Sequence, residues 1–248
     1  MYDYLLGGAA NFAVDREAAE QAASTFPNFR VAVRVNRAFL GRAVRYLVER
    51  GVDQFLDLGS GIPTVGNVHE IARRYNPTAR VAYVDYEPVA VAHARNLLGD
   101  DEYARVALAD IRRPDDVLAA PEVADLLDFS RPIAVLAVAI LHFMPDAEEP
   151  YRVIAAYRDA CAPGSCLALS HGAQVTLTDD QIEAFLAAYA RTPTPAVFRT
   201  REQIARFFTG YRPVEPGVVL LPTWHPDRPV GDDEAAESNI YGGIGVLD

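Results

Sequence analysis

The sequence has few of the features that indicate a secreted protein, a membrane protein or a metal-binding protein. Only two cysteines occur in 248 residues, Cys161 and Cys166, and no histidine pair lies near them. Such spacing indicates neither a disulfide framework nor a structural zinc site, so we expect two buried thiols and no bound metal. No apolar run approaches the roughly 20 residues of a membrane span, and the first residues lack the basic flank of a signal peptide. We therefore expect a cytoplasmic protein that has no membrane partner.

Positive charge is also scarce, because the formal net charge is −11. Proteins that bind nucleic acids usually carry a basic patch or a high isoelectric point, so this balance disfavours DNA and RNA as partners. Hydrophobic residues make up 50% of the chain, enough for a substantial core. We expect a small-molecule substrate, and the sequence leaves the oligomeric state open.

Two common nucleotide-binding patterns are missing. No Gly-Lys-Ser or Gly-Lys-Thr of a Walker loop occurs anywhere. The stretch from Phe55 to Thr64 holds Gly59 and Gly61, but its sixth motif position is Thr64, where a dinucleotide-binding turn has its third glycine. The turn lets a ligand lie close to the backbone but lacks phosphate-binding machinery.

What is present is a series of three apolar, strand-like runs that each end in a glycine or an acid. Residues 53–58 precede the glycine turn, 80–84 precede Asp85, and 106–109 precede Asp110. In an open α/β sheet these ends meet at one edge, where ligands bind. Asp85 follows Gly61 by 24 residues, a spacing that suits an acid binding the ribose hydroxyls. A capping or turn role for Asp85 and Asp110 is the alternative. Carboxylates beside a glycine turn favour a cationic adenosine cofactor.

These motifs resemble those of class I S-adenosylmethionine-dependent methyltransferases. The likeness rests on Asp57-Leu58-Gly59-Ser60-Gly61, Val84-Asp85-Tyr86-Glu87-Pro88 and Ala109-Asp110-Ile111. Three further stretches resemble an actinobacterial methyltransferase family of undefined substrate: Tyr2 to Gly8, Asn36 to Leu40 and Gly61 to Thr64. The resemblance implies an α/β, Rossmann-like fold whose seven-stranded, mostly parallel sheet has an antiparallel last strand. A helical cap would precede it, giving an N-terminal arm and cap at 1–50 and a cofactor-binding domain at 51–248.

The resemblance also implies which residues bind S-adenosyl-L-methionine. Asp85 would accept hydrogen bonds from the ribose, Tyr86 would lie beside the adenine, Asp110 would accept from the adenine amino group, and Ile111 would cover the ring. The full set of expected cofactor-binding residues is Asp57, Gly59, Ser60, Gly61, Asp85, Tyr86, Asp110, Ile111, Ala137 and Arg34.

One histidine and two arginines are further candidates. His142 follows the most apolar strand, 133–140, and in related methyltransferases this strand end lies beside the sulfonium. Its pKa near neutrality would suit a general base, although a structural hydrogen-bonding role is the alternative. Arg34 and Arg37 belong to a cluster on a predicted helix over 29–50, where an arginine could hold the methionyl carboxylate or simply face solvent.

The remaining expectations concern the two ends of the chain. Asp15 is predicted to cap a helix that runs to Thr25, and residues 1–14 form either a surface arm or a flap over the cofactor. Capping boxes are predicted at Asn67 and Thr200, and a stiff linker at 192–195. Strands at 217–222 and 240–246 are expected to pair antiparallel across an acidic loop without a helix.

Three functions remain open from sequence. Methyl transfer to an oxygen or nitrogen of a small molecule is favoured, and it needs a well-positioned acceptor more than a strong base. A noncatalytic module that binds the same cofactor is the second possibility, because a fold and a cofactor motif do not establish turnover. A nicotinamide-dependent oxidoreductase is the third, and the missing glycine argues against it.

Overall fold

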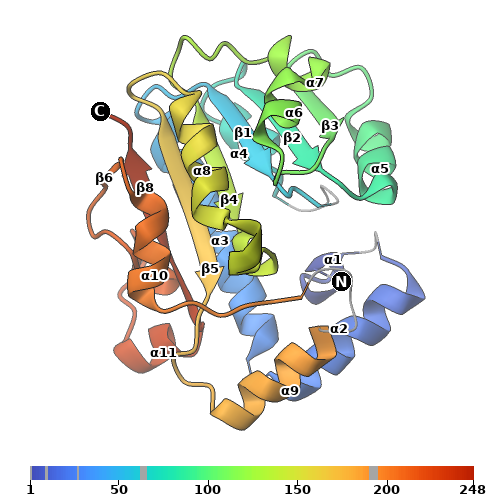
Figure 1. Ribbon diagram of the computed structural model, residues 1–248, viewed down its shortest axis with the longest axis vertical. Helices are drawn as coiled ribbons and strands as arrows, with labels where there is room; N and C mark the ends of the chain where they lie inside the picture. Colours follow the sequence, from blue (N-terminus) through green and yellow to red (C-terminus); the bar gives the residue numbers. More distant parts are fainter. Residues whose placement is uncertain (1, 9–10, 27, 62–65, 190–194) are drawn as a thin grey trace.

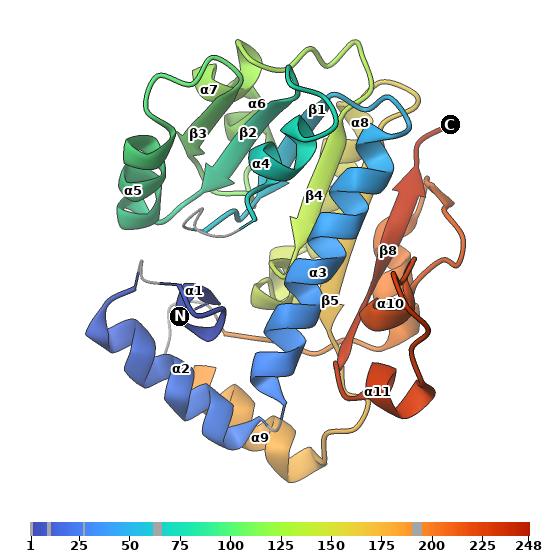
Figure 2. The ribbon, with the colours of Figure 1, turned by 180° about the vertical axis from the view of Figure 1, so that it is seen from behind.

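The protein is a layered α/β structure in which helices cover both faces of one sheet (Figure 1). The computed structural model describes residues 2–8, 11–26, 28–61, 66–189 and 195–248. Helices α3 and α4 lie in front of the sheet in Figure 2, whereas α6 and α8 lie in front of its other face in Figure 1. The expected Rossmann-like class I fold is confirmed.

Five parallel strands form most of the sheet, in the order β3-β2-β1-β4-β5. They are β1 (Gln54–Leu58), β2 (Arg80–Asp85), β3 (Ala104–Leu108), β4 (Ala134–Val138) and β5 (Cys166–Gly172). Strands β1 and β4 are buried almost throughout, as continuous apolar runs covered on both faces should be. Because the strand order reverses between β1 and β4, the ligand crevice of such a sheet opens beyond their carboxyl ends.

An antiparallel edge completes the sheet. Strand β8 (Ile240–Val246) pairs antiparallel with β5, and two short strands, β6 (Arg212–Pro213) and β7 (Val219–Leu220), pair antiparallel with β8. The predicted antiparallel pair between 217–222 and 240–246 is therefore present. The sheet has eight strands where we expected seven, because the outer position is shared by two strands of two residues each.

The helices predicted to begin near Phe29, Asn67 and Thr200 are present. The helices around the sheet are α3 (Phe29–Val48), α4 (Val68–Arg73), α5 (Pro88–Leu98), α6 (Pro114–Ala119), α7 (Pro121–Ala124), α8 (Pro150–Asp159), α10 (Arg201–Ala205) and α11 (Asp232–Ala236). Short 3-10 helices are η1 (Leu141–Phe143), η2 (Asp146–Glu148), η3 (Arg206–Phe208) and η4 (Leu221–Thr223). Both predicted capping boxes, at Asn67 and Thr200, are present. The acidic loop before β8 was wrongly expected to lack a helix, since its acids occupy the first turn of α11.

Three helices gather at the carboxyl ends of the strands. They are α1 (Tyr2–Leu5), α2 (Ala13–Thr25) and α9 (Asp179–Tyr189), and α2 and α9 lie side by side in both views (Figure 2). Helix α2 begins two residues before the predicted cap at Asp15, because the amide of Arg16 already donates to the carbonyl of Phe12. The predicted linker lies mostly outside the described residues, which resume at Pro195.

The core divides between the two faces of the sheet. Helix α3 packs Phe39, Val44 and Leu47 on one face, beside Phe55 of β1. The partition of the chain at residue 50 stays a prediction.

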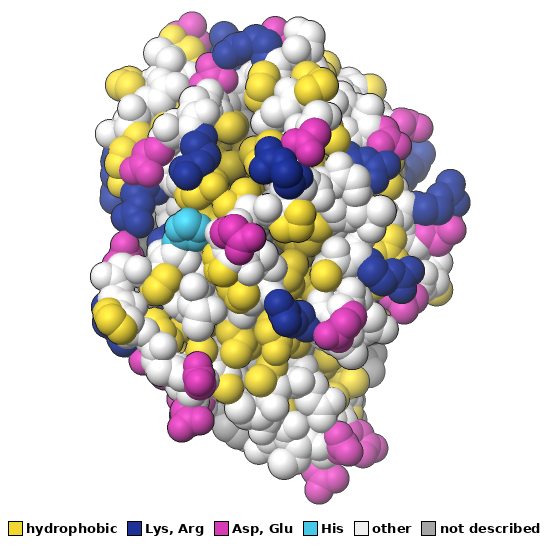
Figure 3. Space-filling view, turned by 90° about the vertical axis from the view of Figure 1, so that its left-hand side faces the viewer, with side chains coloured by type: hydrophobic (Ala, Val, Ile, Leu, Met, Phe, Trp, Pro, Cys, Tyr) yellow, Lys and Arg dark blue, Asp and Glu magenta, His cyan; other side chains and the backbone are white. Residues whose placement is uncertain are grey.

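Among the helices in the described parts of the chain, none has the length and apolar character needed to cross a membrane. On the face shown in Figure 3, acidic and basic side chains are interspersed with hydrophobic ones.

Candidate cofactor and acceptor site

The glycine turn is hydrogen-bonded to the end of the neighbouring strand, β2. The amides of Gly59 and Ser60 both donate to the carbonyl of Val84, at 2.8 and 3.1 Å. Gly59 and Gly61 have positive φ angles of 70° and 62°. A Cβ atom on Gly59 would lie only 2.3 Å from Cγ1 of Ile140, so this position requires glycine for conformation and for space. Residues 62–65 of the motif lie outside the described residues.

Asp85 holds the same turn from the second strand. Its Oδ2 accepts a hydrogen bond from the Gly61 amide at 2.7 Å, and its Oδ1 accepts one from the Glu87 amide at 2.9 Å. The side chain is 8% exposed, and the carbonyl of Asp85 accepts from the amide of Ala109 at 3.0 Å. The structure thus brings the glycine turn, Asp85 and the end of β3 together. The ribose contact itself stays a prediction.

The third acid has a partner that the sequence reading missed. The Arg112 guanidinium donates through Nε and Nη2 to the carboxylate of Asp110, at 2.6 to 2.9 Å. Hydrogen bonds from Arg112 lower the pKa of Asp110, so the acid stays ionised. An adenine amino group would therefore share this carboxylate with Arg112. Ile111 is buried and Tyr86 is 40% exposed, and their predicted adenine contacts remain untested.

The arginine beside the turn is Arg37 rather than Arg34. Arg34 is exposed on α3. Arg37 donates weakly to the Gly66 carbonyl at 3.4 Å, and its Nε is buried without a hydrogen-bond partner. Its charge also acts on Asp57: burial raises the pKa of Asp57 to about 7, and Arg37 opposes this rise. An unpartnered donor of this kind fits the methionyl carboxylate of the expected cofactor.

His142 lies beyond the carboxyl end of β4. Ala137 is fully buried within β4, Ile140 lies against Gly59, and His142 follows in η1. Its Nδ1 is buried and has no hydrogen-bond partner. Burial, and then the charge of Arg199, lower the pKa of His142 to about 4. The expected pKa near neutrality is therefore wrong, and the ring is neutral at physiological pH. His142 lines a cavity of about 60 Å³ together with four phenylalanines: Phe26, Phe29, Phe185 and Phe198.

A buried arginine holds the segment that carries His142, and no sequence motif marked it. Arg199 is 4% exposed and donates to the carbonyls of Leu141 and Met144 at 3.0 and 2.9 Å. It also lies 2.8 Å from Nε2 of His171 and 2.5 Å from Oδ1 of Asp146. Because Nδ1 of His171 faces the Gly172 carbonyl at 2.7 Å, Nδ1 carries the proton and Nε2 accepts from Arg199.

A chain of hydrogen bonds links the N-terminal helix to the same strand ends. Nδ2 of Asn36 donates to the Tyr2 hydroxyl at 2.8 Å, and Oγ of Ser170 donates to Oδ1 of Asn36 at 2.5 Å. The amide of Ala139 then donates to Ser170 Oγ at 2.9 Å. Ala139 has a φ of 57°, a left-handed conformation that is strained for alanine. The arm at residues 2–8 is thus connected to the site, and its role as a flap stays a prediction.

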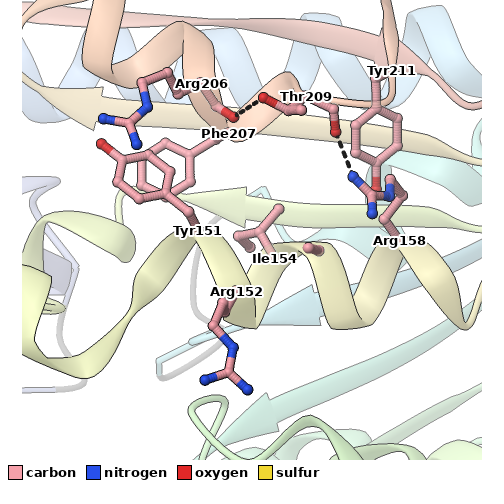
Figure 4. A pocket seen from close by; sticks show the side chains of 9 residues that line it. Tyr151, Arg152, Ile154, Arg158, Arg206, Phe207, Thr209 and Tyr211 are labelled. Atoms are coloured by element: carbon pink, nitrogen blue, oxygen red, sulfur yellow. Dashed lines mark hydrogen bonds between the residues drawn. The ribbon is translucent and has the colours of Figure 1, made fainter.

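A second hollow lies between α8 and η3 (Figure 4), and two of its lining residues, Tyr151 and Phe207, also face Arg199. Its volume is about 230 Å³, and the ring of Tyr151 stacks on Phe207 beside it at 4.4 Å. Arg206 reaches over Tyr151, while Arg158 donates to the Thr209 carbonyl. The sequence analysis placed no site residue there.

The sheet order and the strand ends define a class of protein. A glycine turn after β1 is hydrogen-bonded to an acid at the end of β2, beside the switch point of the sheet. This is the arrangement of a class I S-adenosylmethionine-dependent methyltransferase. The sequence matches the S-adenosyl methyltransferase family over residues 1–248, and the chain belongs to that family. The protein is therefore a methyltransferase that uses S-adenosylmethionine, which favours the methyl donor over a nicotinamide.

Solved structures agree with this assignment. A proposed methyltransferase from Thermobifida fusca is 42% identical, with a TM-score of 0.93 and coverage of 100% of this chain and 93% of that one. A DUF574 family protein from Streptomyces avermitilis is 35% identical, with a TM-score of 0.92 and coverage of 100% and 95%. The N-methyltransferase NodS from Bradyrhizobium japonicum, solved with S-adenosyl-L-homocysteine, is 15% identical with a TM-score of 0.55 over 99% and 97% of the chains, and this likeness concerns the fold. No curated protein matches the sequence.

Proposed function

We propose that the protein methylates an oxygen or nitrogen atom of a small molecule, with His142 as the proton acceptor. The observation that carries the proposal is the unpartnered Nδ1 of His142, a residue that lines a cavity formed mainly by apolar side chains at the ends of β4 and β5. Buried polar atoms are almost always hydrogen-bonded, so an exception at such a place indicates a missing ligand.

The residues on the donor side fit the cofactor. S-adenosylmethionine supplies a methyl group that is already electrophilic because it is bound to a positively charged sulfur. By this proposal Asp85 accepts hydrogen bonds from the ribose, and the unpartnered Nε of Arg37 donates to the methionyl carboxylate. The positions of Gly59, Ser60 and Gly61 let the ligand approach the backbone.

On the acceptor side, the protein's task is to position the nucleophile and exclude water. Holding reacting atoms in line at about 3 Å can supply much of the rate enhancement of a displacement. Arg199 and the amide of Val197, which donates to the His142 carbonyl at 2.7 Å, fix the backbone of η1. His142 is then directed to receive the proton that the acceptor loses.

The test is formation of S-adenosylhomocysteine when the purified protein is given S-adenosylmethionine and pools of small hydroxyl and amino compounds. We expect product with at least one pool, and a large fall in turnover with His142→Gln at near-normal cofactor affinity. Calorimetry should show cofactor binding in both proteins. Cofactor binding with no product from any pool would instead support the noncatalytic module. An unaltered rate in His142→Gln would remove this histidine from the chemistry.

A further inference from the structure

The cavity beside His142 is built mainly from phenylalanine rings. Phe26 directly follows α2, Phe29 is the first residue of α3, and Phe185 lies on α9. The Phe185 ring centroid lies 5.3 Å from that of Phe26, 5.8 Å from that of Phe29 and 5.5 Å from that of Phe198. Tilted and edge-on ring contacts at these separations are the ones that aromatic groups prefer. Three separate parts of the chain thus contribute to one aromatic cluster.

The described residues that line this cavity offer a ligand no opposite charge. No acid, lysine or arginine is among them. The nearest arginine, Arg199, stands behind His171 and already bonds two carbonyls, the histidine and Asp146. A cationic ligand would meet this positive charge without a carboxylate to balance it, and an anionic ligand would find no free cation. Burying an unpaired charge is costly, so the cavity suits an uncharged ligand.

Only one polar side chain in the described lining remains without a partner. Ser170 donates to Asn36 and accepts from Ala139, and both ring nitrogens of His171 are engaged. Asn239 accepts from two backbone amides and donates to Thr176 and the Glu237 carbonyl. Nδ1 of His142 is the exception. With the ring proton on Nε2, this nitrogen accepts one hydrogen bond from a ligand.

We infer that the methyl acceptor is an uncharged phenol whose ring lies among the phenylalanines and whose hydroxyl donates to Nδ1 of His142. This inference rests on the proposed function. A phenolic proton, with a pKa near 10, is acidic enough to leave toward a weak imidazole base during the reaction, unlike that of an aliphatic alcohol. The phenolic oxygen bonds to the methyl carbon as the carbon–sulfur bond breaks, and that electron pair remains on sulfur. The hydroxyl proton passes to His142 and later to water, leaving an aryl methyl ether.

A ring enters this cavity only when side chains move. The cavity of about 60 Å³ is smaller than the roughly 150 Å³ of an engineered apolar cavity that binds benzene. Phe198 lies in the segment before α10, outside any helix, and its Cε1 is 3.3 Å from the point that a Cβ on Gly172 would occupy. Its rotation would enlarge the cavity without moving α3 or α9. Binding of a phenol should therefore broaden or shift the signals of Phe198 more than those of Phe26.

The test is a binding series read by fluorine NMR on the full chain loaded with S-adenosylhomocysteine. The probes are 4-fluorophenol, 4-fluorobenzoate and 4-fluorobenzylamine, with cyclohexanol as a competitor. We expect 4-fluorophenol to bind at least tenfold more tightly than either charged probe, and cyclohexanol to displace it poorly. Equal or tighter binding of a charged probe, or efficient displacement by cyclohexanol, would overturn the inference.

Matched variants place the binding at this cavity. Phe185→Leu removes a ring of the cluster, and we expect 4-fluorophenol to bind at least fivefold more weakly. Phe208→Leu makes the same change at a buried ring that does not line the cavity, and it should leave the affinity within twofold. If Phe185→Leu does not fold, Phe198→Leu takes its place. Unchanged affinity in the cavity variants would contradict the inference.

Turnover separates this inference from the proposed function. Methylation of phenols in preference to the charged compounds and to cyclohexanol supports both. Methylation of an aliphatic or charged acceptor alone would overturn the phenol assignment and leave the proposed function standing. Specific binding of 4-fluorophenol without methylation of any acceptor would support the ligand class and contradict the proposed function.

Discussion

Replacing Asp85 with alanine tests the centre of the donor site. The carboxylate accepts from the amides of Gly61 and Glu87, at 2.7 and 2.9 Å, and is almost fully buried. It therefore does two things at once: it holds the glycine turn, and by the proposal it binds the ribose. The substitution removes both, and the two losses are measurable separately.

The magnitude follows from these contacts. A hydrogen bond to a charged group contributes about 1.5–3 kcal/mol. Glu87 is exposed, so water can replace the carboxylate as the hydrogen-bond acceptor of its amide. The Gly61 amide loses its charged acceptor, and any group that replaces it will bind the amide more weakly. We expect the free energy of unfolding to fall by about 1.5–3 kcal/mol, which corresponds to a melting temperature lower by about 3–10 °C. Loss of the ribose contact should raise the cofactor Kd by about 10- to 150-fold.

Calorimetry with S-adenosylmethionine and thermal unfolding give the two numbers. Asp85→Asn is the control, since its one remaining oxygen can still accept from an amide, and it should fall between wild type and Asp85→Ala in both. Lower stability at unchanged cofactor affinity would show that Asp85 only supports the turn. That result would refute its assignment to the ribose.

Three further predictions concern the remaining parts of the site. Gly59→Ala should lower the free energy of unfolding by about 2–4 kcal/mol, because the added Cβ clashes with Ile140 and the φ angle is unfavourable for alanine. Gly61→Ala should lower it by only about 1–2 kcal/mol, because a Cβ at that position meets open space. Chemical denaturation of the two variants measures both values. The pKa of His142 is 6.5 in the unfolded chain and about 4 in the folded protein, so stability should fall by about 3 kcal/mol as pH drops through that window. His142→Gln should flatten this slope in pH-dependent melts. Arg199→Met should lower the free energy of unfolding by about 2–4 kcal/mol and slow turnover. Asp146→Asn alters only the exposed acid that pairs with Arg199, so it should change the free energy of unfolding by less than about 1 kcal/mol in the same melts.

The donor side was readable from sequence because its parts are local. A turn that needs positive φ requires glycine, and the acid that binds to it must end the adjacent parallel strand, so Gly59 and Gly61 follow one strand and Asp85 ends the next. The same logic predicted the capping boxes at Asn67 and Thr200. Each capping box depends on residues three positions apart, and the glycine turn with its acid depends on the ends of two consecutive strands.

Long-range partners could not be read in this way. Arg112 donates to Glu148, which lies 36 residues further along the chain, and in the sequence the Arg112-Arg113 pair after a strand looks like any solvated turn. Arg199 reaches back 58 residues to the Leu141 carbonyl, a contact that depends on where α9 and the following segment return to the sheet. For the same reason, the geometry of α3 was needed to show that Arg37, rather than Arg34, is the arginine beside the glycine turn.

The residues that we propose bind the methyl acceptor could not be recognised in the sequence, for a different physical reason. In a sequence, a phenylalanine that lines a cavity looks the same as one that fills a core, because both follow the spacing of a buried helix face. Phe26 and Phe185 form the aromatic cluster only because α2 and α9 lie side by side under the strand ends. If these rings select the acceptor, specificity resides in elements outside the sheet and can change while the donor motif stays fixed. Phe185→Leu should then alter phenol binding while S-adenosylmethionine affinity stays within twofold.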